Sequence, residues 1–406
     1  MQNRMKSTVS KLDLFILYLF PFLTYRGYYF IGFNLTQLKL AQFILYAFLI
    51  LYIGRFWFVK SKSSVFNIVR LLFLANLFSI VMAYLFWGQS ISMGFRSTLG
   101  NLTLLYFFLM KYNFSENQLK RFTVFYCVQW VIIYFIALMA APLILFGQSD
   151  LEEGVNDTRG IARFFIEGSD VIYLVFFYCI NGFVEKKPRY AYASGALLIF
   201  VVIVMQVTRQ TILASGLIAF LYLSRKMKHA IRPLIFLLLL LPIAYMQFQK
   251  TEIYKGMTGL TKEQQSDKTE NIRVSEYRYF ILDFPQPSIF TVIFGNGVPH
   301  ADSAYGKSEE RVRDYYKYFR SDVGYASMFA ATGIVGWIIV IVLLMTIRKV
   351  KVPDEYKYIK LFLYFMFLYN IASASFYCIF LCVALYMLTK LEIQQRRQLT
   401  RDRIAI

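Results

Sequence analysis

The sequence predicts an all-α polytopic membrane protein with about twelve transmembrane helices. The chain has 406 residues, of which 58% are hydrophobic and only 17% are charged. Its mean hydropathy is +0.50, which is not typical of a soluble chain of this size. Apolar runs near the length that crosses about 30 Å of hydrocarbon recur along the whole chain. The bilayer and the helix bundle are therefore expected to replace a globular core.

The apolar runs define the predicted spans, and one long hydrophilic segment interrupts them. The spans are 12–31, 38–58, 66–87, 95–110, 122–146, 167–184, 190–206, 210–223, 233–249, 322–347, 359–373 and 375–390. The segment 250–321 separates spans nine and ten, and it is far longer than an ordinary connection, which indicates a functional loop. We therefore divide the chain into a transmembrane bundle (1–249), a loop with short amphipathic helices (250–321), and three spans with a basic tail (322–406).

Basic residues mark alternate connections between the predicted spans. With a cytoplasmic N-terminus, the connections after the even-numbered spans lie in the cytoplasm, and they contain Lys60, Lys111, Lys186, Arg225 and Arg348, among other basic residues. This pattern satisfies the positive-inside rule. Both termini are then cytoplasmic, and the long loop is extracytoplasmic.

Charge and cysteine usage exclude several other classes of protein. The net charge of +20 lies mainly in short loops, so it indicates topology and not nucleic-acid binding. All four cysteines fall inside apolar spans, without the spacing of a disulfide framework or a metal site. We therefore expect neither a metal nor another cofactor.

Three arginines are candidates for binding an anionic group on the outer side. Arg209 lies in a tight outer connection between spans seven and eight, where an arginine at the edge of the hydrocarbon usually has a partner or lines a polar cavity. Its planar guanidinium suits a phosphate or diphosphate, although snorkelling to the interface is the ordinary alternative. Arg273 and Arg278 lie on an amphipathic stretch of the long loop, where local ion pairs on a solvated face are the alternative.

Two further residues are candidates for proton transfer. Asp322 opens span ten, where it could cap the helix or, beside the arginines, accept a proton from a hydroxyl group. His300 follows a Gly-Asn-Gly turn in the long loop and could act as a base near neutral pH, although a lone exposed histidine often has no role.

The layout and four short stretches resemble the Wzy-type polysaccharide polymerase and O-antigen ligase superfamily. The stretches are Thr208-Arg209 in its outer hairpin, Arg273 after span nine, Phe294 to Gly297, and Thr332 to Gly336 in span ten. The resemblance covers most of the chain in layout but only these short pieces in motif. It implies a multi-pass protein of the bacterial cytoplasmic (inner) membrane.

The resemblance implies a metal-independent glycosyl transfer on the outer membrane face. A polyprenyl-diphosphate-linked oligosaccharide would donate its glycan to a hydroxyl of a second lipid-linked repeat unit. Arg209 and Arg273, with Arg278 beside them, would hold the departing diphosphate, and Asp322 or His300 would be the base. Membrane lipid and a chain-length regulator protein are the other partners implied, and nucleic acid is not one.

Two related activities remain as alternatives. Many ligase-like members place a histidine and a small polar residue where this chain has Asp322-Val323, which favours a repeat-unit polymerase over an O-antigen ligase. A lipid-linked oligosaccharide flippase would also have about twelve spans with interior cations, but it would not need the long outer loop.

Overall fold

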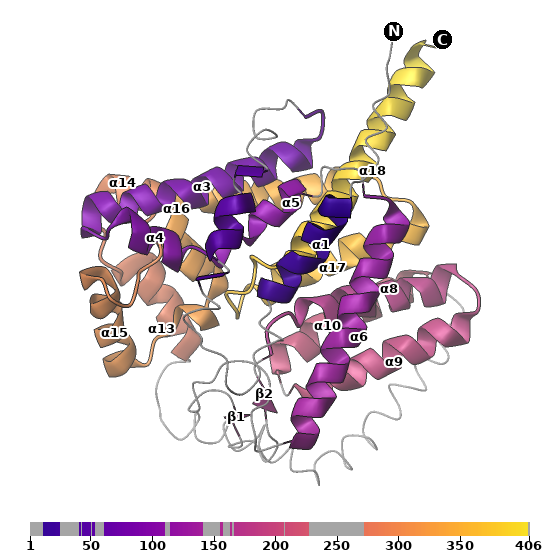
Figure 1. The fold of residues 1–406 in the computed structure, drawn as a ribbon, viewed down its shortest axis with the longest axis horizontal. Coiled ribbons are helices and arrows are strands. Elements are labelled where there is room, and N and C mark those ends of the chain that lie inside the picture. Colours follow the sequence, from indigo (N-terminus) through magenta and orange to yellow (C-terminus); the bar gives the residue numbers. More distant parts are fainter. Residues whose placement is uncertain are drawn as a thin grey trace.

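The computed structural model describes residues 11–24, 40–41, 43–49, 51–52, 61–109, 114–140, 155–156, 163–164, 166–206, 208–226 and 272–404. This part of the chain is almost entirely helical (Figure 1). The helices are α1 (Lys11–Thr24), α3 (Ser64–Trp87), α4 (Ile91–Ser97), η1 (Asn101–Leu104), α5 (Leu105–Leu109), α6 (Glu116–Ala140), α8 (Asp170–Glu185), α9 (Arg189–Met205), α10 (Arg209–Lys226), α13 (Ile272–Arg278), η3 (Tyr279–Asp283), α14 (Ile289–Phe294), α15 (Ala304–Tyr316), η4 (Arg320–Asp322), α16 (Gly324–Lys349), η5 (Asp354–Tyr356), α17 (Lys357–Tyr369) and α18 (Ile379–Ile404). One two-residue antiparallel ladder pairs β1 (Val155–Asn156) with β2 (Arg163–Phe164).

Three helices in the described part, α3, α6 and α16, are long and apolar enough to cross a membrane. Large apolar side chains also cover outward-facing surface, which is expected where lipid replaces water. On α6, for example, Phe125, Val128 and Ile132 are each more than half exposed, and Met139 is 87% exposed. These features support a membrane protein.

Most predicted spans in the described part correspond to helices. The predictions 190–206 and 210–223 correspond to α9 and α10, and 66–87 corresponds to α3. Residues 40–41, 43–49 and 51–52 are helical within predicted span 38–58. Predicted span 233–249 lies outside the described residues, as do 25–31 and 141–146.

Two predicted spans are not continuous helices. Residues 95–110 divide into α4, η1 and α5, because the hydroxyls of Ser97 and Thr98 bond back to the Gly94 carbonyl (3.0 and 2.8 Å) and the chain turns before Asn101. The helix α16, predicted as span 322–347, breaks at Gly333, which has φ +64° and ψ −161°.

The break in α16 folds its two halves against each other. The Trp337 indole N–H donates to the Tyr325 carbonyl at 2.7 Å, whereas twelve residues of straight helix would separate these positions by about 18 Å. The Phe329 and Trp337 rings also meet, with centroids 5.1 Å apart. The chain after the long loop therefore makes a short helical arm, a glycine turn and a returning helix.

Connections predicted to be cytoplasmic meet in the structure. Lys226 at the end of α10 pairs with Glu185 at the end of α8 (2.9 Å) and with Asp354 after α16 (3.0 Å). The carboxylate of Glu392 on α18 accepts hydrogen bonds from the backbone N–H groups of Ser64 (2.9 Å) and Val65 (3.2 Å), so it caps α3. The end of α18 projects beyond the other helices (Figure 1).

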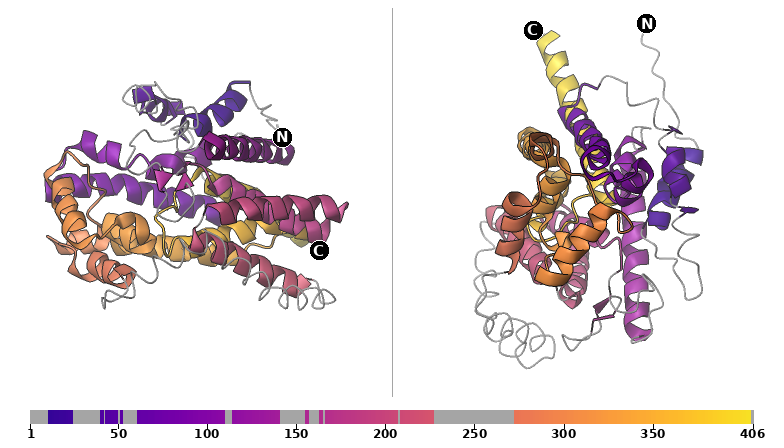
Figure 2. Two further views of the ribbon diagram at one scale, coloured as in Figure 1. Left: turned by 90° about the horizontal axis from the view of Figure 1, so that it is seen from below. Right: turned by 90° about the vertical axis from the view of Figure 1, so that its left-hand side faces the viewer.

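Segments of the predicted outer loop gather away from that region. The helices α13, α14 and α15 lie together at one end of the molecule, whereas α8, α9 and α10 lie toward the other (Figures 1 and 2). A small apolar cluster joins this group to the arm of α16, and its buried members are Phe280, Phe284, Tyr305, Val323, Ala326 and Ala330. The long loop thus packs on the bundle through its own core.

Candidate functional site

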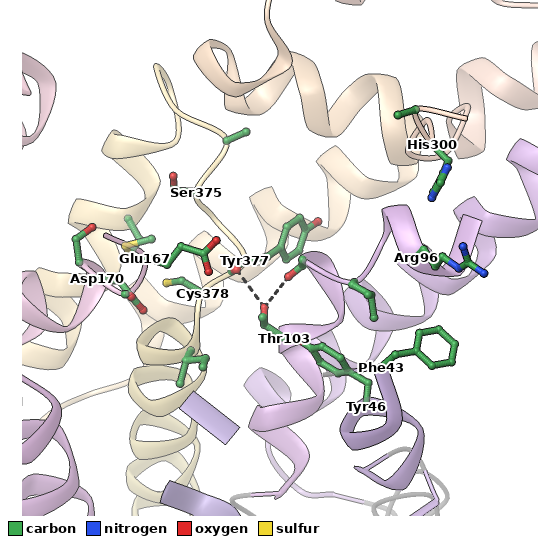
Figure 3. A pocket seen from close by; sticks show the side chains of 18 of the residues that line it. Phe43, Tyr46, Arg96, Thr103, Glu167, Asp170, His300, Ser375, Tyr377 and Cys378 are labelled. Carbon is green, nitrogen blue, oxygen red and sulfur yellow. Dashed lines mark hydrogen bonds between the residues drawn. The ribbon is translucent and has the colours of Figure 1, made fainter. Parts of the chain in front are cut away.

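A cavity of about 1220 Å³ lies where the predicted outer ends of several helices converge. Its walls come from α4, the start of α8, the segment 300–302, the end of α17 and the start of α18 (Figure 3). The lining carries the ionisable residues Arg96, Glu167, Asp170, His300 and Asp302, together with several tyrosines and small polar residues. The cavity is larger than a typical small-molecule pocket of about 300–1,000 Å³ and can hold more than one sugar unit.

One side of the cavity holds Arg96 and His300 (Figure 3). The buried Gln89 donates to the Val298 carbonyl at 2.9 Å and accepts from the His300 N–H at 2.8 Å. The Ser97 hydroxyl also donates to the Val298 carbonyl, at 2.7 Å. The segment before α4 and the end of α4 therefore hold the chain that carries His300.

The opposite side of the cavity is acidic, and one of its carboxylates has a structural role. Asp170 accepts a hydrogen bond from the Phe380 N–H at 2.9 Å and so caps the start of α18. Glu167 precedes α8, its side chain is exposed, and its carbonyl accepts from the Trp130 indole at 3.1 Å. Glu167 is therefore an exposed carboxylate in the cavity lining.

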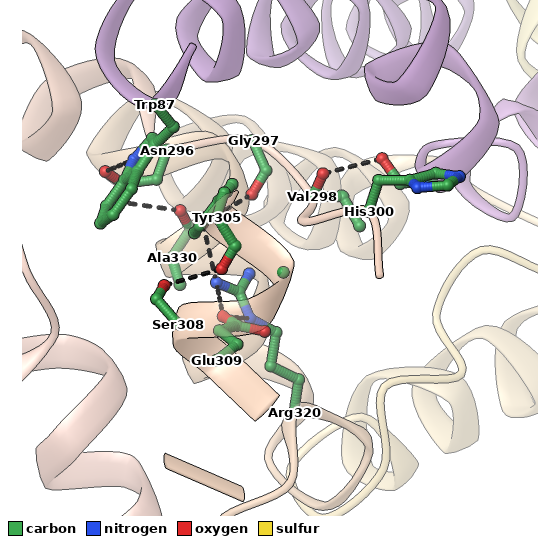
Figure 4. Close-up of polar contacts among 12 residues, drawn as sticks. Trp87, Asn296, Gly297, Val298, His300, Tyr305, Ser308, Glu309, Arg320 and Ala330 are labelled. Atoms are coloured by element: carbon green, nitrogen blue, oxygen red, sulfur yellow. Dashed lines mark hydrogen bonds and ion pairs between the residues drawn. The ribbon is translucent and has the colours of Figure 1, made fainter. Parts of the chain in front are cut away.

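The Gly-Asn-Gly turn that precedes His300 rests on the break in α16 (Figure 4). The Asn296 N–H donates to the Ala330 carbonyl at 2.8 Å, and the Gly297 N–H donates to the Ala331 carbonyl at 3.0 Å. The Asn296 side chain accepts from the Trp87 indole at 3.0 Å. The Gly-Asn-Gly turn and the Gly333 region of α16, both noted in the sequence, therefore pack together and position His300.

A partly buried arginine, Arg320, supports the same region through contacts with α15 (Figure 4). Arg320 pairs with Glu309, donates to the Tyr305 hydroxyl at 3.0 Å, and lies 5.2 Å from the ring of Phe284. Burial alone would lower the pKa of Arg320, but Glu309 and Tyr305 outweigh burial and raise it. The guanidinium is thus a fixed charge, and the Tyr305 ring stacks on Trp87 at 4.4 Å.

Two of the predicted site residues, Arg273 and Asp322, lie near one buried carboxyl group. Glu276 is 1% exposed and accepts a hydrogen bond from the Phe319 N–H at 2.9 Å. Burial raises the pKa of Glu276 to about 7, with a further contribution from Asp322, while the Phe319 N–H and Arg273 oppose the rise. Asp322 itself accepts from the Ser321 hydroxyl, and no side chain caps α16.

We expect Glu276→Gln to remove a pH dependence of stability. The folded pKa of about 7 lies above the unfolded value of 4.5, so the stabilisation is complete below pH 4.5 and is lost as the pH rises through 7. The loss amounts to about 3 kcal/mol, and the amide keeps the bond from Phe319. Unfolding midpoints in detergent should fall from pH 5 to 8 for wild type and stay flatter for Glu276→Gln. The exposed Glu310→Gln should follow wild type, and equal slopes for Glu276→Gln and wild type would contradict the prediction.

The remaining predicted residues lie on other surfaces. Arg278 is exposed and pairs with Asp283 at 3.6 Å, the local ion pair that was its alternative interpretation. Arg209 begins α10 and is exposed. The cavity-lining Tyr173 donates to Gln206 at 3.2 Å, three residues before Arg209, so this connection borders the cavity wall.

Arg96 and Glu167 were missed in the sequence, although both carried a signal. Each lies at the start of an apolar run that was taken as a span, Arg96 in 95–110 and Glu167 in 167–184. A charge at the edge of a span indicates a functional position in the same way as Arg209. Their convergence with His300 depends on contacts between distant segments, which local patterns do not contain.

No protein-family model matches the chain, and no curated protein matches it significantly. In the part of the chain that the structure describes, no three His, Cys, Asp or Glu side chains are grouped so that they could hold a metal ion. The chemistry of the cavity is therefore the basis for assigning a function.

Proposed function

We propose that the protein joins polyprenyl-diphosphate-linked oligosaccharide repeat units on the outer face of a bacterial cytoplasmic membrane. The observation that carries this proposal is the cavity, which combines a cationic side, an acidic side and several aromatic rings at helix ends predicted to face outward. A glycosyl transfer needs a carboxylate or imidazole for the acceptor hydroxyl and cations for the departing diphosphate. The resemblance to the Wzy-type superfamily points to the same reaction.

The proposed step needs no further reactant. The acceptor hydroxyl oxygen attacks the anomeric carbon of the donor glycan, and the bond from that carbon to the diphosphate oxygen breaks. The electron pair leaves with the lipid diphosphate, and the hydroxyl proton passes to the base. Glu167 and His300 line the cavity and are candidates for the base, with Asp322 as a third candidate outside the lining. Arg209 and Arg273, which also lie outside the lining, are the predicted cations for the diphosphate.

The predicted topology belongs to the same proposal. About twelve spans with both termini in the cytoplasm would give the cavity an opening toward the outer leaflet, where the lipid carrier presents its glycan. The junction of Glu185, Lys226 and Asp354 supports this orientation, because it joins connections that the positive-inside rule assigns to the cytoplasm. Arg278, exposed and paired with Asp283, contributes least among the predicted diphosphate ligands.

The test is complementation of a strain from which the gene has been deleted. Deletion should replace the ladder of surface polymer by single repeats, and wild type should restore the ladder. Glu167→Gln should reduce polymer at least about 100-fold, because general bases contribute 10²–10⁴-fold, whereas the exposed Glu310→Gln should restore the ladder fully.

The same strain separates the alternatives. A flippase would leave no repeats on the outer face after deletion, and an O-antigen ligase would leave finished polymer on its lipid carrier. Either result would contradict the polymerase. A lost ladder with an active Glu167→Gln variant would keep the polymerase and move the base to Asp322 or His300.

A further inference from the structure

We infer that Arg96 and His300 form an anion-binding subsite within the cavity, which takes a phosphate or carboxylate group of the substrate. The inference rests on the proposed function only for the origin of that group, which is either the lipid diphosphate or an acidic sugar. It adds a residue, Arg96, that neither the sequence motifs nor the predicted arginine set contains.

The guanidinium of Arg96 is available to a ligand. The side chain is exposed and lines the cavity, and within the described residues it makes no ion pair and no side-chain hydrogen bond. The other arginines of the outer region that contact carboxylates include Arg278 with Asp283 and Arg320 with Glu309. A planar guanidinium with five donors matches the oxygens of phosphate or carboxylate in a bidentate manner.

His300 presents a second donor to the same side of the cavity. The Asp302 N–H donates to the imidazole Nδ1 at 3.3 Å, so the neutral ring carries its proton on Nε2. The ring is 16% exposed and lines the cavity, and Figure 3 shows it on the side of Arg96. In this tautomer the Nε2–H group of His300 can donate a hydrogen bond to an anion in the cavity.

The nearby carboxylates are arranged so that an anion can approach. The Asp302 carboxylate lies 3.6 Å from Nδ1 and is 77% exposed, so it faces the edge of the ring away from Nε2. Glu167 and Asp170 lie on the far side of the cavity from Arg96 and His300 (Figure 3). The separation of charges across the cavity gives an anion one favourable side.

The backbone segments that carry the two donors are held together before any ligand binds. Gln89 is 1% exposed and bonds both the Val298 carbonyl and the His300 N–H, while Ser97, next to Arg96, bonds the same carbonyl. A hydrogen bond from the Ser303 hydroxyl to Gln89 at 2.9 Å adds a third point of attachment. Fixing the two segments lowers the entropy cost of bringing both residues onto one ligand.

The subsite can be tested by direct binding to the purified full-length protein in detergent. Three probes are compared by calorimetry: farnesyl diphosphate, inorganic pyrophosphate and methyl glucuronide. We expect wild type to bind at least one of them and Arg96→Gln to bind it at least about tenfold more weakly, since hydrogen bonds to charged groups contribute about 1.5–3 kcal/mol. Arg96→Lys should recover part of the affinity, and His300→Gln should weaken it less than Arg96→Gln does. Arg311→Gln, an exposed arginine on α15, is the matched control.

The probes distinguish the two origins of the anion. Preference for the phosphate probes assigns the subsite to the lipid diphosphate, and preference for methyl glucuronide assigns it to an acidic sugar. Binding that Arg96→Gln leaves unchanged, in a variant with wild-type unfolding midpoint, would overturn the inference, as would the absence of binding to wild type. Because the assay needs no polymerisation, loss of binding in Arg96→Gln would stand even if gene deletion left the polymer ladder intact.

Discussion

Gly333→Ala is expected to lower the free energy of unfolding by at least about 3 kcal/mol and to displace the Gly-Asn-Gly turn that packs on this break. The φ of +64° and ψ of −161° at this position belong to a region that is essentially restricted to glycine. A Cβ here would lie 2.5 Å from the Ile293 carbonyl oxygen and 2.6 Å from the Gly295 nitrogen. Both atoms belong to the backbone, so the clash cannot be relieved by a change of rotamer.

The measurement is the unfolding midpoint of the purified variant, together with its yield in the membrane. Gly216→Ala is a matched control, because a Cβ at Gly216 in α10 would meet nothing within 4 Å. We expect Gly216→Ala to match or slightly exceed wild type, since alanine is the better helix former. A Gly333→Ala protein with wild-type stability would show that α16 does not require its break. The partial loss of farnesyl diphosphate binding expected for this variant would follow from movement of His300.

Local patterns predicted the helices where one apolar run ended in charged residues. The run of α9 begins at Arg189, and α10 extends from Arg209 to Arg225 and Lys226, so the charges mark where lipid ends. The amphipathic stretch of the long loop that carries Arg273 and Arg278 is likewise helical, as α13. These helices depend on residues that are close in the sequence, so local patterns are sufficient to predict them.

The two broken spans could not be predicted in the same way. Residues 95–110 read as one apolar run, but α4 is held by the bond from Ser97 to Val298, about two hundred positions further along the chain. The Gly333 turn packs against the backbone of Gly295, which directly follows α14, and the Gly297 N–H donates to the Ala331 carbonyl beside it. Both features depend on tertiary contacts that override helix propensity.

The candidate site was predicted in part for the same reason. His300 was selected from its turn and lines the cavity, and Asp322 and Arg273 both lie near Glu276. The sequence did not indicate a role for Arg320. Its structural role depends on the packing of its guanidinium over the rings of Phe280 and Phe284. Burial of a charged residue is a property of the fold and has no signature in local spacing.

Arg320→Met is expected to cost about 3 kcal/mol, because it leaves Glu309 without its partner in a site where its side chain is 19% exposed. The double variant Arg320→Met, Glu309→Met should recover much of the loss, since it removes the unpaired charge and leaves an apolar pair beside Phe280 and Phe284. Arg313→Met removes an exposed ion pair on α15, the helix that also carries Glu309, and should change the free energy of unfolding by less than about 1 kcal/mol. The double-variant cycle consists of wild type, Arg320→Met, Glu309→Met and the double variant, and it is measured by unfolding midpoints. Equal losses of unfolding free energy for Arg320→Met and Arg313→Met would mean that water screens the Arg320–Glu309 pair. The position of Tyr305 would then depend on its ring packing with Trp87 alone.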